Sequence, residues 1–245
     1  MRPLAIGLFA AYFSVSSGLC AGGTRKLPYS EKLVYDVYWK FINVGYGTLE
    51  IKGVVDFRGR KAYSICSESV SAPFFDFFFK VRDTNYSWVD AENFYSLAFE
   101  QHIREGGFKR NRRINYDQAA HTAVNNKGES FGIPANVLDV LAALYRVRTL
   151  DLRPDSAITV AVNSGKKNYD MRVKIDGRDT VEVAGKKINA LIVEPELQDT
   201  GIFMNKGALI IWFSDDENHI PLKMQSEISV GSIMAVLNGL PSGYN

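Results

Sequence analysis

The sequence predicts an all-β protein: a strongly curved antiparallel sheet that forms an open or closed barrel, with one amphipathic helix near the middle of the chain. Three observations support this fold class. Apolar and polar residues alternate along most of the 245 residues, which is the pattern of half-buried antiparallel strands. Turn-forming stretches such as 104–109 and 163–168 separate these runs. A sheet of more than ten antiparallel strands has to curl, either into a barrel or into a wide half-open one.

The N-terminal segment has the pattern of a secretory signal peptide. A positive residue precedes an uncharged apolar stretch at 4–15, and small residues follow. We expect cleavage after Ala21; lipidation of Cys20 is disfavoured because Leu19, rather than a small residue, precedes it. No later stretch approaches 18 apolar residues, so no transmembrane span is expected. The protein is therefore predicted to be exported, periplasmic or associated with the outer envelope, with residues 22–245 as a single β-barrel-like domain.

The charge balance and the cysteines exclude some classes of function. The net charge of +2 and the pI of about 8.4 are too balanced to predict nucleic-acid binding. After cleavage, Cys66 is the one remaining cysteine, so an intrachain disulfide is excluded. It lies in the middle of a predicted strand, where a buried, inert thiol is expected rather than a nucleophile. No cofactor is predicted.

The strands are expected in two groups along the chain. In the first group, alternation runs through 33–41, through 45–52 with two glycines on the apolar face, and through 62–69. In the second group it runs through 158–162, 171–175, 188–192 and 209–213. The acidic stretch SDDENHIP that follows has the composition of a tight turn. Calcium binding or acid–base chemistry is the alternative for its carboxylates.

The segment 133–154 breaks the two-residue period and predicts the helix. Six apolar residues recur there at helical spacing: Val137, Leu138, Val140, Leu141, Leu144 and Tyr145. Asn136, which follows Pro134, is the expected N-cap, and the helix should end before Pro154. A single amphipathic helix in such a chain is expected to plug the end of a barrel or to lie across an open sheet.

Five blocks of sequence carry a resemblance to a known family: EKLVYDVYWKFINVGYGTLEI, APFFDFFFKVRDTNYSWVD, FEQHIREGGFKRNRRINYD, KINALIVEPELQDTGIF and IWFSDDENHIPLKMQSEISVGSIMAVL. In this order they resemble domain of unknown function 3108, a family of exported bacterial β-proteins. The similarity covers about residues 27–240. It implies a secreted, curved antiparallel fold that is similar to an open barrel, and it supplies no catalytic residues.

Enzymatic chemistry finds little support in the residues. The three histidines, His102, His121 and His219, are far apart in the sequence and form no zinc-binding motif. The nucleophile-elbow, P-loop and dinucleotide-binding motifs are absent. Paired carboxylates occur at 194–196 and 215–217, and glycosidase chemistry would need two carboxyls about 5–10 Å apart across a cleft. We therefore predict no catalytic residue and no metal ligand.

The stretch HIREGGFKRNRRINYD predicts a basic hairpin around its Gly-Gly pair. Beyond the turn, Arg110 and Arg112 share a face with Phe108, Ile114 and Tyr116. Before the turn, His102 and Arg104 share a face. The structural interpretation is a solvated hairpin whose charges prevent edge pairing. The functional interpretation is an anionic or polyhydroxylated ligand held by guanidinium groups and rings, which Arg82 could join.

The stretch SAPFFDFFFKVRD holds five phenylalanines between 74 and 79. Pro73 and Asp76 favour a short helical turn at the lip of the sheet. The favoured interpretation is that the rings close the end of the barrel as core. The alternative is a hydrophobic lip that offers rings to a lipid, a glycan or a protein partner. Three tryptophans on predicted strands share this ambiguity.

We predict a non-enzymatic exported protein that binds an amphipathic lipid or a carbohydrate in a β-barrel groove. The first alternative is an envelope structural or assembly protein that docks a protein partner through the aromatic lip and an edge strand. A carbohydrate-active enzyme is the weaker alternative. The candidate ligand-binding residues are Trp39, Phe75, Phe78, Phe79, Arg82, Trp88, His102, Arg104, Arg110, Arg112 and Trp212.

Overall fold

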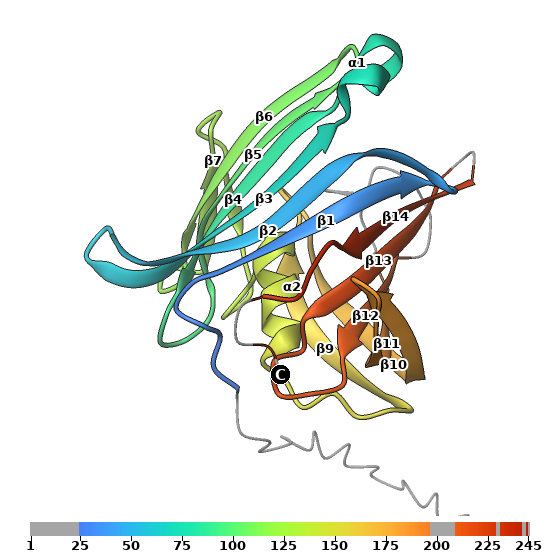
Figure 1. Cartoon of the computed structure of the whole chain (residues 1–245). Helices are drawn as coiled ribbons and strands as arrows, with labels where there is room; N and C mark the ends of the chain where they lie inside the picture. Colours follow the sequence, from blue (N-terminus) through green and yellow to red (C-terminus); the bar gives the residue numbers. More distant parts are fainter. Residues whose placement is uncertain (1–24, 197–208, 229–230, 242–243, 245) are drawn as a thin grey trace, which may run out of the picture.

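The computed structural model describes residues 25–196, 209–228, 231–241 and 244 (Figure 1). The predicted signal peptide, its cleavage site and Cys20 lie outside these residues. The described elements are β1 (Glu31–Trp39), β2 (Ile42–Phe57), β3 (Arg60–Ser71), α1 (Pro73–Phe79), β4 (Arg82–Asp90), β5 (Ser96–Glu105), β6 (Phe108–Asp117), β7 (Thr122–Asn125), β8 (Ser130–Gly132), α2 (Val140–Arg148), β9 (Ser156–Asn163), β10 (Asn168–Val183), β11 (Lys186–Pro195), β12 (Leu209–Ser214), β13 (Pro221–Ile228) and β14 (Gly231–Leu237). Neither helix in these ranges is long and apolar enough to cross a membrane.

All of these strands belong to one antiparallel sheet, which confirms the predicted fold class. Its order is β8-β7-β6-β5-β4-β3-β2-β1-β14-β13-β12-β11-β10-β9. The pairing of β1 with β14 joins the first and last strands of the chain in the middle of the sheet. The two edges are β8 and β9, so the sheet is open rather than closed.

The sheet curls strongly because its longest strands bend at bulges. β2 and β10 have 16 residues each, and their registers shift beside Gly53 and Gly177. Both glycines have φ in the left-handed half of conformational space, at 134° and 141°. A bulge with a glycine bends a strand and increases its twist. The two bends fold each half of the sheet around a common interior (Figure 1).

Side chains and one extended segment hold the two edges of the curled sheet near each other. Tyr116 Oη on β6 donates to Asn163 Oδ1 on β9 at 3.2 Å, and Asn168 Nδ2 donates to the carbonyl of Gly132 at 2.8 Å. Leu138 pairs in parallel with β9, through bonds of 3.0 Å to Ala161 O and 2.8 Å from Asn163 N. These contacts link the two edges without pairing β8 with β9, so the sheet stays open.

The helix α2 is shorter than predicted and begins later. Its N-cap is Asp139, whose carboxylate accepts hydrogen bonds from the backbone N–H groups of Leu141 and Ala142. The prediction of Asn136 as the N-cap was wrong. Asn136 adopts a left-handed φ of 56°, which is not the extended conformation of an N-cap residue. The backbone of Leu138 is extended and pairs with β9, so the helix cannot begin there.

The C-terminal end of α2 is fixed by a buried ion pair. Arg148 donates to both carboxylate oxygens of Glu31 on β1, at 2.6 and 2.9 Å, and its Nε donates to the carbonyl of His219 at 3.1 Å. The Arg148 and Glu31 side chains are 1% and 8% exposed. The helix thus rests inside the curled sheet and contributes six buried residues to the core: Leu141, Ala142, Ala143, Tyr145, Val147 and Arg148.

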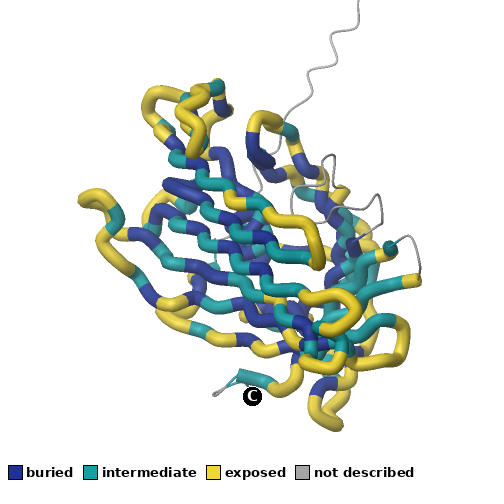
Figure 2. The backbone as a smooth tube through the Cα atoms, turned by 90° about the horizontal axis from the view of Figure 1, so that it is seen from above, coloured by how far each residue is buried: buried dark blue, intermediate teal, exposed yellow. Residues whose placement is uncertain are grey.

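Burial follows the two-residue period of the strands. Figure 2 shows buried positions alternating with more exposed ones along the strands, while exposed residues gather in the turns. Tyr35 illustrates the inward face: it is 1% exposed, and its hydroxyl donates to the carbonyl of Pro221 at 2.8 Å. The predicted core thiol is confirmed, since Cys66 is 1% exposed.

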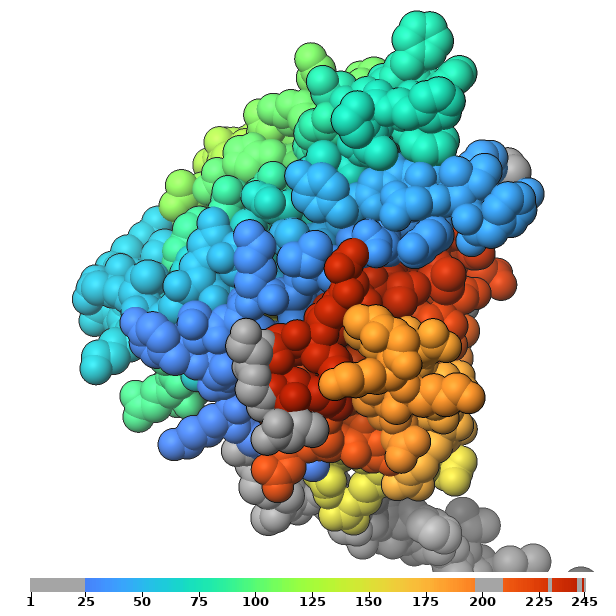
Figure 3. All heavy atoms as spheres, viewed as in Figure 1, coloured from blue at the N-terminus to red at the C-terminus, as the bar shows by residue number. Residues whose placement is uncertain are grey.

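The short helix predicted in the phenylalanine stretch is confirmed as α1, but the interpretation of its rings as core was wrong. No residue of α1 is buried. Four of the rings are exposed, with fractions of 72% for Phe74, 87% for Phe77, 69% for Phe78 and 56% for Phe79. The helix lies at the far end of the β3–β4 hairpin and extends beyond the body of the sheet (Figure 3), so it has no core to enter.

Candidate functional site

A cavity of about 270 Å³ lies between the inner face of the sheet and α2. The side chains of its wall are mainly apolar, and they include Val37, Leu49, Leu144, Met171, Ile211 and Ala235. Small-molecule sites in proteins typically have volumes from about 300 Å³ upward, and a dry cavity of about 150 Å³ already holds one benzene ring. The cavity therefore has room for a slender apolar group.

The strand period places these side chains on the inner face. On β12, Leu209, Ile211 and Phe213 are two residues apart and all contact the cavity. On α2, the residues that contact the cavity include Val140, Leu144 and Val147, which are four and three residues apart. Residues i+2 on a strand, and i+3 or i+4 on a helix, share one face. The apolar lining is thus a direct consequence of the alternation in the sequence.

The cavity reaches one end of the sheet, which we call the rim. The rim holds the β1–β2, β5–β6 and β9–β10 turns and α1, because these connections all follow strands that run in the same direction. Cavity residues close to this end include Ser69, Pro195, Leu209, Ser226 and Ile233. At the other end, α2 fills the interior. An apolar group could therefore enter from the rim.

A row of polar side chains crosses the inner face beside the apolar wall. Asn85 Nδ2 donates to Ser67 Oγ at 3.1 Å, and Gln101 Nε2 donates to Asn85 Oδ1 at 3.0 Å. Ser67, Asn85 and Ser69 all contact the cavity. Gln101 is fully buried, and within the described residues its Oε1 has no hydrogen-bond partner. This polar edge could hold the polar end of a ligand.

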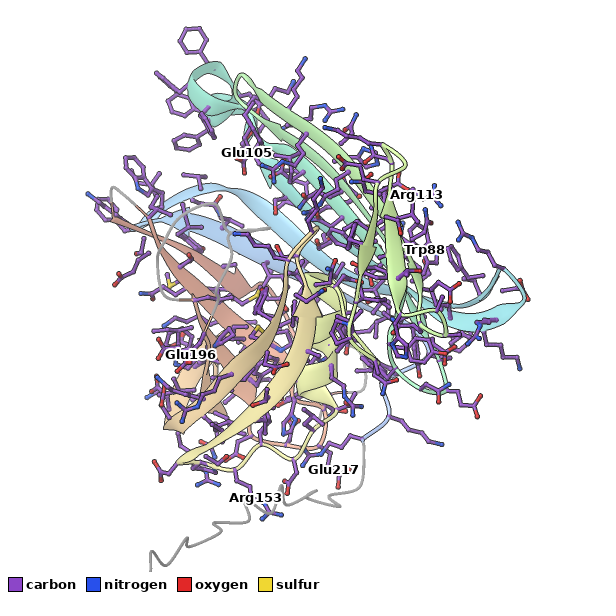
Figure 4. All side chains as sticks on the ribbon, turned by 180° about the vertical axis from the view of Figure 1, so that it is seen from behind. Trp88, Glu105, Arg113, Arg153, Glu196 and Glu217 are labelled. Carbon is purple, nitrogen blue, oxygen red and sulfur yellow. The ribbon has the colours of Figure 1, made fainter. Side chains whose placement is uncertain are left out.

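An acidic pair lies on the same inner face, nearer the rim. The carboxyls of Asp83 and Glu105 hydrogen-bond to each other, and Asp83 Oδ1 also accepts from the backbone N–H of Arg104 at 2.7 Å. Burial, and then the charge of Asp83, raise the pKa of Glu105 to about 7, while Arg110 opposes the shift. Glu105 is therefore partly protonated near neutral pH. Figure 4 shows Glu105 directly below α1.

The basic hairpin is present as β5 and β6, but its predicted site residues divide between two faces. Arg112 lies on the inner face: its guanidinium is 5.5 Å from the ring of Phe99. It also covers Gly165 so closely that a Cβ there would lie 2.9 Å from Nη1. Arg110 shares this face, where its charge acts on Glu105. Arg112 thus spans from β6 to the β9–β10 turn, across the gap between the sheet edges.

The other two hairpin residues, His102 and Arg104, lie on the outer face. His102 Nε2 is 2.8 Å from Glu100 Oε1, and its Nδ1 is 3.1 Å from Asn111 Oδ1. Arg104 Nη1 donates to the same Asn111 oxygen at 2.9 Å. These contacts form a surface network, and they place both side chains away from the cavity.

The three predicted tryptophans do not line the cavity either. Trp88 stacks on Phe57 on the outer face, with ring centroids 5.2 Å apart (Figure 4). Trp212, which is 8% exposed, donates from Nε1 to Asp179 Oδ2 at 2.9 Å, and Lys223 Nζ lies 3.8 Å from its ring centroid. Trp39 is half-buried at the rim, opposite the cavity residue Ile233.

The remaining predicted residues belong to the turn that carries α1. Arg82 does not reach the basic hairpin: its Nη2 donates to Asp76 Oδ2 at 2.6 Å, and its Nη1 donates to Ser71 Oγ at 3.1 Å. These bonds fix α1 to the end of β3. Phe75 is half-buried, with its ring centroid 5.2 Å from that of Phe74, while Phe78 and Phe79 are exposed.

Two kinds of site can be checked in the part of the chain that the structure describes, a metal centre and a reactive thiol. No cluster of histidine, cysteine and carboxylate side chains there could hold a metal ion. Burial raises the pKa of the Cys66 thiol to about 11, so the thiolate is not available. The acidic stretch is a turn, as predicted: Asp216 Oδ1 accepts from Ser214 Oγ at 2.9 Å and from the backbone N–H of Asn218 at 2.8 Å.

None of the eleven candidate ligand-binding residues contacts the cavity, although one signal for it was present in the sequence. The cavity wall on β2 and β3 includes three small residues, Gly47, Ser67 and Ser69. Small residues on the inward face of a strand leave space that a core would otherwise fill. The pattern of Gly45 and Gly47 sharing a face with Leu49 could have indicated a hollow there. The cavity residues on β10–β14 could not be found in this way, because their place beside β1 depends on pairing between distant parts of the chain.

The comparisons with known proteins agree with this architecture. A family model described as "Protein of unknown function (DUF3108)" matches residues 34–238. The chain belongs to this family. The resemblance carried by the five blocks is thus confirmed, and DUF3108 membership gives the chain a family without giving it an activity. A search of curated proteins finds no significant match to the DUF3108 chain.

A solved structure shows a similar fold. It is the "Crystal Structure of Beta-barrel-like Protein of Domain of Unknown Function DUF1849 from Brucella abortus", with a TM-score of 0.58 to the DUF3108 chain. The match covers 90% of this chain and 100% of that one, at 9% sequence identity. At such low identity the similarity concerns the fold alone, and the fold of that protein is described as β-barrel-like.

Proposed function

We propose that this protein is a non-enzymatic binding protein that holds one acyl chain of an amphipathic molecule in the cavity between α2 and the sheet. The observation that carries the proposal is the apolar lining of a cavity that reaches the rim. Each buried methylene contributes about 0.8 kcal/mol, so about eight would contribute roughly 6 kcal/mol before the cost of association is subtracted. A Kd of 1 μM corresponds to about 8 kcal/mol, so contacts of the head group would have to supply the rest of the binding free energy.

The polar edge of the cavity supports an amphipathic ligand rather than a pure hydrocarbon. Ser67, Ser69 and Asn85 offer hydroxyl and amide groups at the boundary of the apolar wall. A head group placed there would keep its hydrogen bonds while the acyl chain leaves water. A glycan fits less well, because the stacked rings that could hold a sugar, Trp88 and Phe57, lie on the outer face and have cations above them.

The place of action is part of this proposal. The signal-peptide pattern of the first 21 residues supports export, and the protein would then bind its ligand in the periplasm or at the outer envelope. A protein that keeps an acyl chain out of water is useful in such a compartment, since amphipathic molecules must cross it between membranes.

A titration with a fluorescent fatty acid tests the proposal. Ala235 and Val236 are adjacent, half-buried residues of β14, but only Ala235 contacts the cavity. Ala235→Trp should fill the cavity and weaken binding at least tenfold, whereas Val236→Trp places the same ring on the opposite face and should leave the Kd within about twofold. Equal affinities for the two variants, or wild-type protein that does not bind the probe, would refute the proposal.

A further inference from the structure

The exposed apolar side chains of this protein concentrate at the rim. Twelve large apolar residues of the described chain are exposed, and seven of them lie in three turns at this one end. They are Phe41 and Ile42 in the β1–β2 turn, Phe74, Phe77, Phe78 and Phe79 in α1, and Phe108 after the β5–β6 turn. Single exposed apolar residues are ordinary, but a gathered set of this kind marks an interaction surface.

Backbone contacts connect these turns into one continuous surface. Ala72 N, just before α1, donates to Val44 O at 2.8 Å. Gly106 N donates to Lys80 O at 2.8 Å, and the ring of Phe79 covers Gly106. We call the seven residues and the turns that carry them the aromatic rim.

Apart from Phe79, whose ring covers Gly106, the rings of α1 contact one another. The centroids of Phe77 and Phe78 are 5.2 Å apart at an interplanar angle of 88°, and Phe74 packs against Phe75 in the same way. The space-filling view shows α1 protruding from the end of the sheet (Figure 3). Because these side chains add nothing to the core, stability of the fold does not explain them.

Each of the three turns also carries a lysine beside its phenylalanine. Lys40 precedes Phe41, Lys80 follows Phe79, and Lys109 follows Phe108, and all three lysines are exposed. The acid within α1, Asp76, is paired with Arg82 at 2.6 Å. Glu105 hydrogen-bonds to Asp83 on the inner face. The outward charge of the aromatic rim is therefore positive.

We propose that the aromatic rim docks the protein onto the surface of an anionic lipid bilayer, with the rings in the interfacial layer and the three lysines at the head groups. Aromatic rings favour the membrane interface, and lysines extend from it toward anionic lipid phosphates. The cavity reaches this same end of the sheet. Docking would thus place the cavity where an acyl chain could pass between bilayer and protein without crossing water.

The shape of the aromatic rim favours a bilayer over a protein partner. A protein-docking surface is usually a packed patch with a central anchor in a pocket. Here the rings sit on three separate turns, and α1 presents Phe77 and Phe78 at a protruding tip. Separate protruding rings with lysines beside them suit a soft, deformable partner with uniform negative charge. A protein partner is the competing outcome of the test below.

Vesicle co-sedimentation of the full mature chain tests the proposal. Wild-type protein should bind vesicles that contain phosphatidylglycerol, and binding should fall as salt is added. The double variant Phe77→Ser/Phe78→Ser should reduce the bound fraction at least tenfold. Tyr29→Ser is the matched control, since Tyr29 has the same 69% exposure as Phe78 but lies outside the rim. Because none of these side chains is buried, circular dichroism should confirm that all variants fold.

Three results would overturn the docking proposal. One is wild-type protein that does not bind vesicles. A second is equal loss of binding in the rim variant and in Tyr29→Ser. The third is specific capture of a protein by the rim, with no binding to protein-free vesicles. The cavity variant Ala235→Trp should still bind vesicles, so failure of docking and failure of acyl-chain binding would be observed separately.

Discussion

The pKa of Glu105 depends on its burial and on its charged neighbours on the inner face of the sheet. Its carboxyl hydrogen-bonds to Asp83 on β4 and faces Arg110 on β6. Burial, followed by the charge of Asp83, raises the pKa of Glu105 to about 7. The folded protein therefore binds more protons than the unfolded chain between about pH 4.5 and pH 7. In this window the contribution of Glu105 to the free energy of unfolding falls as the pH rises.

The variant Glu105→Gln should remove this pH dependence. It keeps a hydrogen-bonding group beside Asp83 but does not ionise. We expect the variant to be as stable as wild type near pH 4.5 and more stable near pH 8, by on the order of 1 kcal/mol after allowance for solvent screening. Urea denaturation at both pH values measures this. If the stability difference between wild type and variant does not change with pH, the raised pKa of Glu105 is refuted.

For single residues, the sequence could predict which face of a strand a side chain lies on, but not which distant residues it contacts. The alternation placed Arg110 and Arg112 correctly on one face with Ile114 and Tyr116, because strand geometry is local. It could not predict that Arg112 reaches the β9–β10 turn, since that contact joins residues on opposite edges of the sheet. Arg82 was expected near the basic hairpin, and its pairing with Asp76 inside its own turn was missed.

At the scale of elements, Asp139 connects α2 to the sheet. Besides capping the helix, its Oδ2 accepts from Ser87 Oγ and Ser96 Oγ, both at 2.6 Å. Ser96 Oγ is also 2.7 Å from the backbone N–H of Asp139. Burial raises the pKa of Asp139, while these bonds oppose the shift. The start of α2 is therefore held by β4 and β5 as well as by its own cap.

The variant Asp139→Ala should destabilise the protein by about 3 kcal/mol, since it removes the cap and leaves two buried serine hydroxyls without their acceptor. Asp139→Asn keeps an acceptor oxygen and should cost about 1 kcal/mol. Midpoints of urea denaturation, at unchanged slope, measure both. A loss below about 0.5 kcal/mol for the alanine variant would show that α2 is held by other contacts.

The elements also show where sequence prediction succeeds and where it fails. Most strands were predicted, because a half-buried strand requires apolar and polar residues to alternate, and this alternation is visible in the sequence. The start of α2 was misplaced because Val137 and Leu138 fit a helical pattern but are bound to β5 and β9 instead. The rings of α1 were assigned to the core because composition cannot show that the turn extends beyond the sheet.

At the scale of the whole molecule, the open sheet is what creates the candidate site. The sheet curls around α2 without closing, and the helix fills only part of the interior. Residues from both halves of the chain contact the cavity, and the pairing of β1 with β14 brings them together. Such a site is not visible in the sequence, because its volume depends on the curvature of the entire sheet. The same curvature places the aromatic rim beside it.

Native mass spectrometry of the protein, purified from its own cells without detergent or added ligand, is the first measurement to make on the proposed acyl-chain site. We expect an additional mass of one amphipathic molecule on the wild-type protein and on Val236→Trp, and its absence on Ala235→Trp. A wild-type protein that carries no additional mass and takes up none from added fatty acids would contradict the proposal. So would a bound molecule that Ala235→Trp retains.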